Sequence, residues 1–223
     1  MAESPKKRGL MFVAVALVLG MVAGAATIYG IGGFNGNGSN AIQTAQSCTL
    51  TEEKKETLRA AVTGDVATMA IADKPVPLAE IGFQLPDGTQ KTFADMKDKV
   101  ILLNLWATWC GPCREEMPDL AKLQDKYGSD DFEVFALNVD RNGGSKPAAF
   151  LREIQAESLG LYLDPSNKSF QAMRSKGLVF GLPTTMVLDD QGCVQGVMSG
   201  IAHWWSDDAK NFVEVAMREL SAS

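Results

Sequence analysis

The 223-residue sequence is poor in the side chains that hold metal ions. It contains one histidine, His203, and four cysteines, only two of which form a Cys-x-x-Cys pair. A zinc site takes four protein ligands, or three and a water molecule. Because there is no second such pair and His203 lies far from the first in the sequence, we expect no bound metal, and we expect no cofactor.

Long basic stretches are also missing. The formal net charge is −6, and no stripe rich in Lys and Arg follows the first ten residues. Nucleic-acid-binding surfaces concentrate these cations, so no nucleic acid partner is expected. Internal repeats are absent, whereas 46% hydrophobic and 22% charged residues are typical of a globular chain. The sequence therefore predicts one globular domain with an appendage.

Charged residues are absent from residues 9–34, which directly follow a basic cluster at residues 6–8. About 20 apolar residues are enough for a transmembrane helix, and flanking basic residues stay in the cytoplasm. We expect a cytoplasmic basic N-terminus (1–9), a transmembrane anchor (10–34), a flexible linker (35–47) and an exported domain (48–223). The alternative is a signal peptide, either uncleaved or cleaved at the small residues 23–25. Both interpretations place the domain outside the cytoplasm.

Two of the cysteines, Cys110 and Cys113, lie between an apolar run at residues 100–105 and an amphipathic stretch at residues 114–127. This pattern predicts a buried strand followed by a helix. Unpaired N–H groups and the dipole at a helix amino terminus favour a thiolate, so Cys110 is expected to be the nucleophile. Cys113, one helical turn later, is expected to be the resolving thiol. Pro112 suits an early helix position because its missing N–H would be unpaired there anyway.

Strand and helix patterns alternate along the rest of the chain. Strands are expected at residues 100–107, 133–139 and 160–163, hairpins at 83–93 and 184–198, and helices at 51–61, 114–127, 145–157, 166–176 and 206–220. Because the first two strands are continuously apolar, we expect them to be central, parallel and joined by a crossover helix. The order predicts an α/β fold with a central mixed sheet flanked by helices.

Two motifs carry a resemblance to a known family. The sequence Trp-Cys-Gly-Pro-Cys at residues 109–113, followed by Pro118, resembles the active-site signature of thioredoxins. Residues 181–185, Gly-Leu-Pro-Thr-Thr, resemble the family's cis-proline loop. The likeness covers residues 75–220 and is greatest to membrane-anchored TlpA-like thioredoxins and the cytochrome c-maturation thiol–disulfide oxidoreductases. It implies a thioredoxin fold with an N-terminal extension and a β-and-helix insert.

The resemblance also implies a client-binding surface. Pro183 would be a cis-proline that faces the dithiol and binds the backbone of a client protein. Trp109, Pro112 and Leu182 would form an exposed apolar docking surface beside it. The alternative for Pro183 is an ordinary turn proline, and for Trp109 a core aromatic.

Glu116 is the carboxylate that the resemblance singles out. In the TlpA-like and cytochrome c-maturation group, a glutamate three residues after the second cysteine helps to move protons. Glu116 would take the proton of Cys113 so that its thiolate can attack the mixed disulfide. Plain thioredoxins bury an aspartate where this chain has Asn104, and asparagine cannot act as a base. The alternative is that residues 114–116 are a solvated helix start.

The other two cysteines, Cys48 and Cys193, remain once Cys110 and Cys113 are assigned to a redox pair. Exported chains seldom keep idle thiols in an oxidising compartment. A structural disulfide between Cys48 and Cys193 is therefore expected, closing a loop of about 145 residues and contributing up to ~5 kcal/mol. The alternative is two independent buried cysteines.

The function expected from these features is thiol–disulfide exchange by a single-pass protein of the cell inner membrane, with its domain in the periplasm. The Gly-Pro dipeptide between the cysteines is that of reducing thioredoxins, so we expect a reductase. The resemblance implies a membrane thiol-electron donor, and clients such as apocytochrome c or proteins that assemble the copper centre of cytochrome oxidase. The alternatives are a Cu(I) metallochaperone, because thiolates bind Cu(I) well, and a thiol peroxidase on the same fold.

Overall fold

Strands and helices alternate along the chain in the computed structural model, which describes residues 48–141 and 145–221. The helices are α2 (Glu52–Ala61), α3 (Gly111–Tyr127), α4 (Ser145–Glu153), α5 (Lys168–Ser175) and α6 (Asp207–Leu220), with short 3-10 helices at Gly64–Val66, Phe93–Met96 and Glu157–Leu159. The strands are β1 (Ala70–Pro77), β2 (Gly82–Gln84), β3 (Gln90–Thr92), β4 (Val100–Trp106), β5 (Phe132–Asn138), β6 (Tyr162–Leu163), β7 (Thr184–Leu188) and β8 (Cys193–Ser199).

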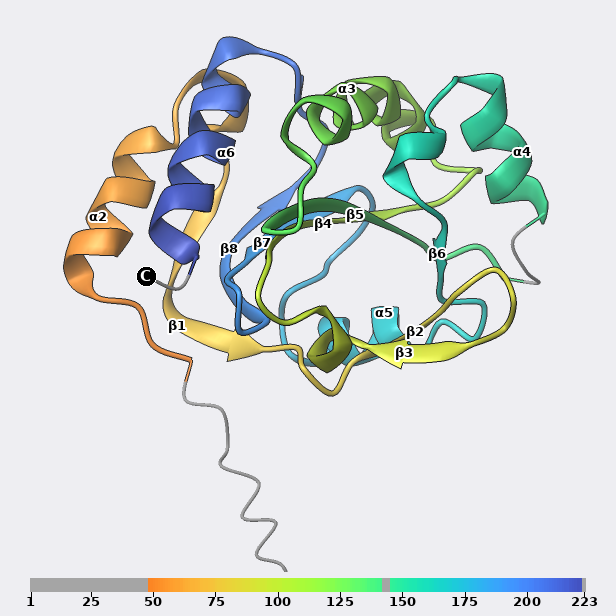
Figure 1. Ribbon diagram of the computed structural model, residues 1–223, viewed down its shortest axis with the longest axis horizontal. Coiled ribbons are helices and arrows are strands. Elements are labelled where there is room, and N and C mark those ends of the chain that lie inside the picture. Colours follow the sequence, from red (N-terminus) through yellow and green to blue (C-terminus); the bar gives the residue numbers. More distant parts are fainter. Residues whose placement is uncertain (1–47, 142–144, 222–223) are drawn as a thin grey trace, which may run out of the picture. The chain divides into compact units, whose positions relative to one another are not determined.

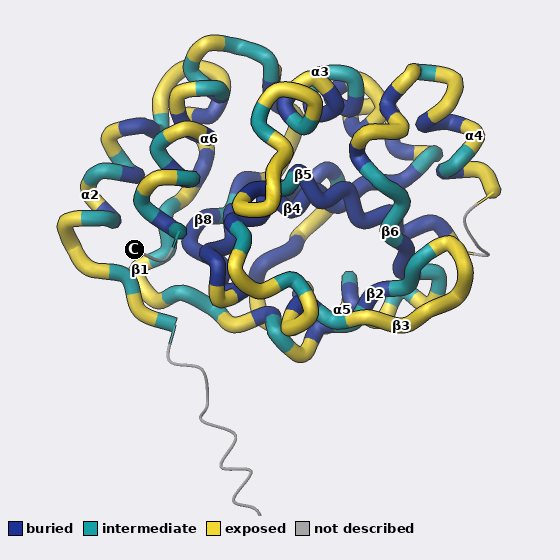
Figure 2. The backbone as a smooth tube through the Cα atoms, in the orientation of Figure 1, coloured by how far each residue is buried: buried dark blue, intermediate teal, exposed yellow. Residues whose placement is uncertain are grey.

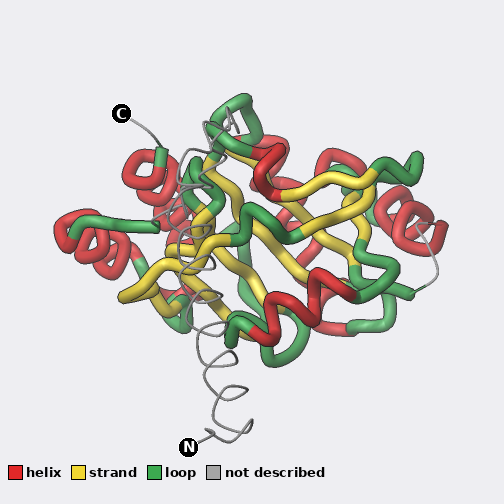
Figure 3. The backbone as a smooth tube through the Cα atoms, turned by 90° about the horizontal axis from the view of Figure 1, so that it is seen from below, coloured by secondary structure: helices red, strands yellow, loops and turns green. Residues whose placement is uncertain are grey.

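The strands form one mixed sheet in the order β1-β8-β7-β4-β5-β6-β2-β3. At its centre, β4 pairs in parallel with β5 and antiparallel with β7. Helix α3 connects β4 to β5, so the expected crossover unit is confirmed. The two expected hairpins are present as β2–β3 and β7–β8. Figure 3 shows the strands side by side between the helices.

Strand β4 is buried along its whole length because both faces of the sheet are covered (Figure 2). Successive side chains of a strand point to opposite faces. Leu102 and Trp106 therefore join the core beneath α2, α3, α4 and α6, whereas Leu103 and Leu105 join the core beneath α5 and the β2–β3 hairpin. Figure 1 shows α3 and α5 on opposite sides of the sheet. Asn104 shares the α3 face of β4 with Leu102 and Trp106.

The chain before the hairpin forms a strand that the sequence did not predict. Strand β1 pairs antiparallel with β8 and is an edge of the sheet. It contains Pro75 and Pro77, which cannot donate a ladder hydrogen bond and are typical of loops. An edge strand tolerates proline because one side of its backbone has no partner strand. The helix expected in front of it is confirmed as α2, with Thr51 accepting the Lys54 N–H at its start.

Helix α4 is shorter than predicted. It ends at Glu153, and the chain then passes through Gln155 with φ +56° before a short 3-10 helix at Glu157–Leu159. A positive φ is incompatible with a continuing right-handed helix, so the expected helix at residues 145–157 is divided in two.

Among residues 48–141 and 145–221, no helix is both long and apolar enough to cross a lipid bilayer. The expected cytoplasmic N-terminus, transmembrane anchor and linker lie outside the described residues.

Candidate active site

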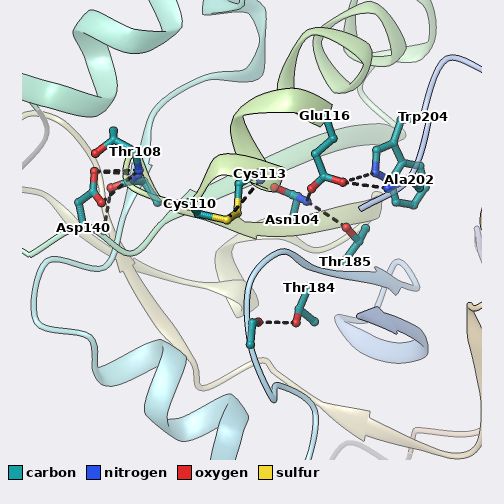
Figure 4. Close-up of a disulfide and its surroundings, with 12 residues drawn as sticks. Asn104, Thr108, Cys110, Cys113, Glu116, Asp140, Thr184, Thr185, Ala202 and Trp204 are labelled. Atoms are coloured by element: carbon teal, nitrogen blue, oxygen red, sulfur yellow. Dashed lines mark hydrogen bonds between the residues drawn. A yellow bond between two sulfur atoms is a disulfide. The ribbon is translucent and has the colours of Figure 1, made fainter. Parts of the chain in front are cut away.

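A disulfide joins Cys110 and Cys113 at the amino end of α3, directly after the central strand β4 (Figure 4). The two cysteines differ in exposure. Cys110 is 6% exposed, whereas Cys113 is completely buried. Because exchange requires an incoming sulfur to reach one sulfur of the disulfide, this asymmetry gives Cys110 the outer position and Cys113 the inner one.

The start of α3 is built to hold negative charge on Cys110. Cys110 is the N-cap of the helix, and its sulfur accepts the Cys113 N–H at 3.2 Å. Pro112, in the first turn, has no N–H that would need a partner. In the reduced protein, the same N–H and the positive end of the helix dipole would stabilise a Cys110 thiolate.

The loop opposite this disulfide contains a cis peptide bond between Leu182 and Pro183, as the resemblance implied. The Thr184 hydroxyl donates to the Gly181 carbonyl at 2.8 Å and braces the loop where β7 begins. Pro183 itself is buried, whereas Gly181 is exposed and Leu182 is partly exposed. The accessible part of the loop therefore lies just before the proline.

An open groove of ≈ 800 Å³ runs beside Cys110. Its apolar lining comes from both sides of the site and includes Trp109, Pro112, Val139, Phe170 and Leu182. Pro183 is not among the residues that line this groove, although its neighbour Leu182 is. The predicted docking residues Trp109, Pro112 and Leu182 are thus brought together next to Cys110.

Large apolar side chains are exposed in or beside the segments that line this groove. Within the described residues they are Trp109 (71% exposed), Phe180 (79%) and Ile201 (45%). Phe180 lies three residues before Pro183, and Ile201 follows Gly200, whose N–H donates to the Pro183 carbonyl at 3.0 Å. The sequence analysis missed Phe180 and Ile201. Phe180 could have been found from the sequence, because it directly precedes Gly181, the first residue of the cis-proline motif.

Glu116 is buried on α3, three residues after Cys113, and is only 1% exposed. Residues three apart on a helix share a face, so the carboxyl group lies one turn from the inner sulfur. Burial raises the pKa of Glu116 to about 7, although hydrogen bonds from Asn104, Ala202 and Trp204 act in the opposite direction. A carboxyl group with a pKa near 7 can both accept and return a proton near neutral pH.

Asn104 connects Glu116 to the neighbouring strand. Its side-chain amide donates to Glu116 Oε1 at 2.7 Å and to the Thr185 hydroxyl at 2.9 Å. Its own oxygen has no hydrogen-bond partner among the described residues. Figure 4 shows Asn104 between the disulfide and Glu116. Among the residues that the structure describes, Glu116 supplies the only carboxyl group of this buried cluster, and the Asn104 amide orients it.

Asp140 holds the segment between β4 and α3 in place. The sequence analysis did not single it out. It follows β5, is 7% exposed, and accepts the Thr108 N–H at 3.2 and 3.3 Å (Figure 4). Parallel strands end at the same edge of the sheet, so the end of β5 lies beside the end of β4. This bond holds the segment that presents Trp109 and Cys110.

A second disulfide joins Cys48 and Cys193, which are 145 residues apart. This is the pairing expected from the sequence. Cys193 is the first residue of β8 and is 1% exposed. The bridge ties the chain in front of α2 to the terminal hairpin, and neither of its cysteines belongs to the groove beside Cys110.

These features define a thioredoxin-fold protein of the thiol–disulfide oxidoreductase class, with its disulfide at a helix start facing a cis-proline loop. The chain belongs to the Redoxin family, whose model matches residues 71–212. Thioredoxin-like protein YneN of Bacillus subtilis is 35% identical over 132 residues, which are 53% of this chain and 71% of YneN. Thiol:disulfide interchange protein HelX of Rhodobacter capsulatus is 33% identical over 134 residues, 59% of this chain and 69% of HelX.

Solved structures share the fold. The crystal structure of a secreted thiol-disulfide isomerase from Corynebacterium glutamicum superposes with a TM-score of 0.53 and 26% sequence identity. The superposition covers 71% of this chain and 95% of that protein. The likeness agrees with the fold and the class of chemistry inferred from the site.

Proposed function

We propose that this protein is a membrane-anchored thiol–disulfide reductase whose domain faces the periplasm. The observation that carries the proposal is the Cys110–Cys113 disulfide at the start of α3, beside an apolar groove and a cis-proline loop. An outer sulfur that lines an open groove, a buried partner sulfur and an apolar surface for a polypeptide are the parts that exchange with a protein disulfide requires.

The reaction begins from the reduced dithiol. The Cys110 thiolate attacks one sulfur of the client disulfide, forms a mixed disulfide and releases the other client sulfur as a thiolate. Cys113 then gives its proton to Glu116 and attacks the Cys110 sulfur. The client leaves as a second thiolate, and the Cys110–Cys113 disulfide forms again. Two electrons pass from the protein to the client, so a donor must then reduce the protein.

The donor and the clients follow from the family resemblance. We propose a membrane thiol-electron carrier as donor, because a reductase in an oxidising compartment must be recharged there. The proposed clients are apocytochrome c or proteins that assemble the copper centre of cytochrome oxidase. The anchor at residues 10–34 would keep the domain at the outer surface of the cell inner membrane.

The direction of electron flow can be measured by equilibrating the purified chain with glutathione buffers and quantifying the Cys110 and Cys113 thiols. A reductase with Gly-Pro between its cysteines should have a potential near that of thioredoxin, about −270 mV. A potential near that of the strong oxidant DsbA, about −120 mV, would overturn the proposed direction while leaving the exchange chemistry intact.

Glu116→Gln should slow the release of client from the mixed disulfide by about 10²-fold at pH 7, the lower end of the range for general acid–base catalysis. Only the carboxylate form accepts a proton. Because burial places the pKa of Glu116 at about 7, the wild-type rate should rise between pH 6 and 8. The variant should lose that component of the rise. Single-turnover release of a labelled client from a preformed mixed disulfide, across pH 5 to 8, measures both effects.

Glu115→Gln is the matched control, because Glu115 precedes Glu116 on α3 but is exposed. It should leave the rate and its pH dependence unchanged. Identical profiles for wild type and Glu116→Gln would exclude Glu116 as the proton acceptor.

A further inference from the structure

The loop between β8 and α6 connects the client-binding surface to the buried carboxyl group. At its start, the Gly200 N–H donates to the Pro183 carbonyl at 3.0 Å, and Gly200 has φ +101°, a conformation that favours glycine. The next residue, Ile201, is exposed beside the cis-proline loop. The chain then turns inward to the completely buried Trp204. Figure 4 shows Ala202 and Trp204 converging on Glu116 from this loop.

Two N–H groups of this loop bind one oxygen of Glu116. The Ala202 backbone N–H donates to Oε2 at 3.3 Å, and the Trp204 indole N–H donates to the same oxygen at 3.1 Å. The sequence analysis did not single out Trp204. A buried indole N–H needs a partner, and here that partner is the carboxyl group beside the active disulfide.

We propose that Trp204 is a positioning residue for thiol–disulfide exchange, whose indole N–H holds the Glu116 carboxylate ready to accept the proton of Cys113. The inference rests on the proposed function, because it assigns Trp204 a part in the step that releases the client. The loop between β8 and α6 would then contact both parts of the site. Its first residue, Gly200, bonds to the cis-proline loop, and Trp204 bonds to Glu116.

The groups around Glu116, besides the Ala202 N–H and the Trp204 indole, are neutral. Strand β4 contributes the neutral Asn104 amide, which in turn contacts the Thr185 hydroxyl of β7. On α3, the titratable group one turn away is the thiol of Cys113 in the reduced protein. Among the residues that the structure describes, Glu116 has no ion pair. Hydrogen-bond donors alone therefore oppose the effect of burial on the carboxylate.

Trp204→Phe should shift the pH dependence of client release upward. An N–H donor favours the charged carboxylate over the neutral acid, so its loss raises the pKa of Glu116. A hydrogen bond to a charged group corresponds to about one pH unit, or about tenfold in the equilibrium. The rate at pH 6 should therefore fall about tenfold, and the difference should disappear at high pH, where Glu116 is ionised in both proteins.

Trp106→Phe is the matched control. Trp106 is also completely buried on the α3 side of the sheet, but its indole N–H donates to the Ala136 carbonyl at 3.3 Å. This variant makes the same change in size and should leave the midpoint of the pH profile in place. Superimposable profiles for wild type and Trp204→Phe, or equal shifts in both tryptophan variants, would overturn the proposal.

The wild-type protein offers a second test that does not depend on a tryptophan variant folding. The ¹⁵N–¹H resonance of the Trp204 indole should shift with a midpoint near the Glu116 pKa of about 7, and the shift should be absent in Glu116→Gln. An indole resonance that does not move between pH 5 and 9 would overturn the inference. If Glu116→Gln slows client release while Trp204 neither titrates nor alters the profile, only this inference fails. If Glu116→Gln has no effect, the proposed role of Glu116 fails first.

Discussion

Cys113→Ser should convert the protein from a catalyst into a trap. Cys110 can still attack a client disulfide, but the mixed disulfide has no neighbouring thiol to resolve it. Oriented intramolecular groups reach effective concentrations of about 10⁵ M or more, which millimolar external thiols cannot replace. Multiple-turnover reduction should therefore fall by about 10³-fold or more. Non-reducing electrophoresis should show client linked to Cys110, and mass spectrometry of the trapped species should identify both the client and the linked sulfur.

Cys110→Ser is the matched control for trapping, because it removes the outer sulfur instead of the inner one. Cys113 is completely buried, so a folded Cys110→Ser protein should trap almost no client. Equal trapping by the two variants would mean that either thiol can attack a client disulfide. The assignment of Cys110 as nucleophile and Cys113 as resolving thiol would then be wrong.

Replacing Cys48 and Cys193 together with alanine should lower the free energy of unfolding by about 2–5 kcal/mol. The bridge closes a long loop, because its two cysteines are 145 residues apart in the sequence, and so restricts the unfolded chain strongly in the loop-entropy model. Denaturant unfolding of the wild type and the double variant, both with the Cys110–Cys113 disulfide intact, measures the difference.

The same double variant should retain thiol–disulfide exchange under conditions where it is folded, because the bridge lies outside the groove beside Cys110. Equal unfolding free energies would contradict a structural role for the bridge. Alkylation of Cys48 in the native wild-type protein would show that the bridge does not form in solution.

Local sequence patterns predicted the parts of the fold that depend on neighbouring residues. The apolar run of β4, the amphipathic α3 and the position of Cys110 at the start of α3 all follow from such patterns. Strand β1 was missed because its prolines are typical of loops, and only its place at the edge of the sheet makes them tolerable. This segment forms a strand because it pairs with β8, which lies more than a hundred residues later in the chain.

In the candidate site too, neighbouring residues predicted some features, whereas others depend on residues far apart in the sequence. The motif at residues 109–113 and Glu116 were found through neighbouring residues and the resemblance that they carry. The hydrogen-bond partners of Glu116 were not predicted. Ala202 and Trp204 lie 86 and 88 residues away from it, and the sequence around them contains no recognisable motif. Asp140 was missed for the same reason, because its partner Thr108 lies 32 residues away in the sequence. Contacts of this kind depend on how the strands and loops meet, which local patterns do not specify.

The central claim is that Cys110 and Cys113 together give two electrons to a client disulfide. The most direct measurement mixes the reduced wild-type protein with a protein disulfide, quenches the reaction at intervals with a thiol-reactive mass tag, and analyses both partners by mass spectrometry. We predict that the protein loses two taggable thiols, at Cys110 and Cys113, for every client disulfide that becomes two thiols. A protein that keeps both thiols while the client stays oxidised would contradict the account.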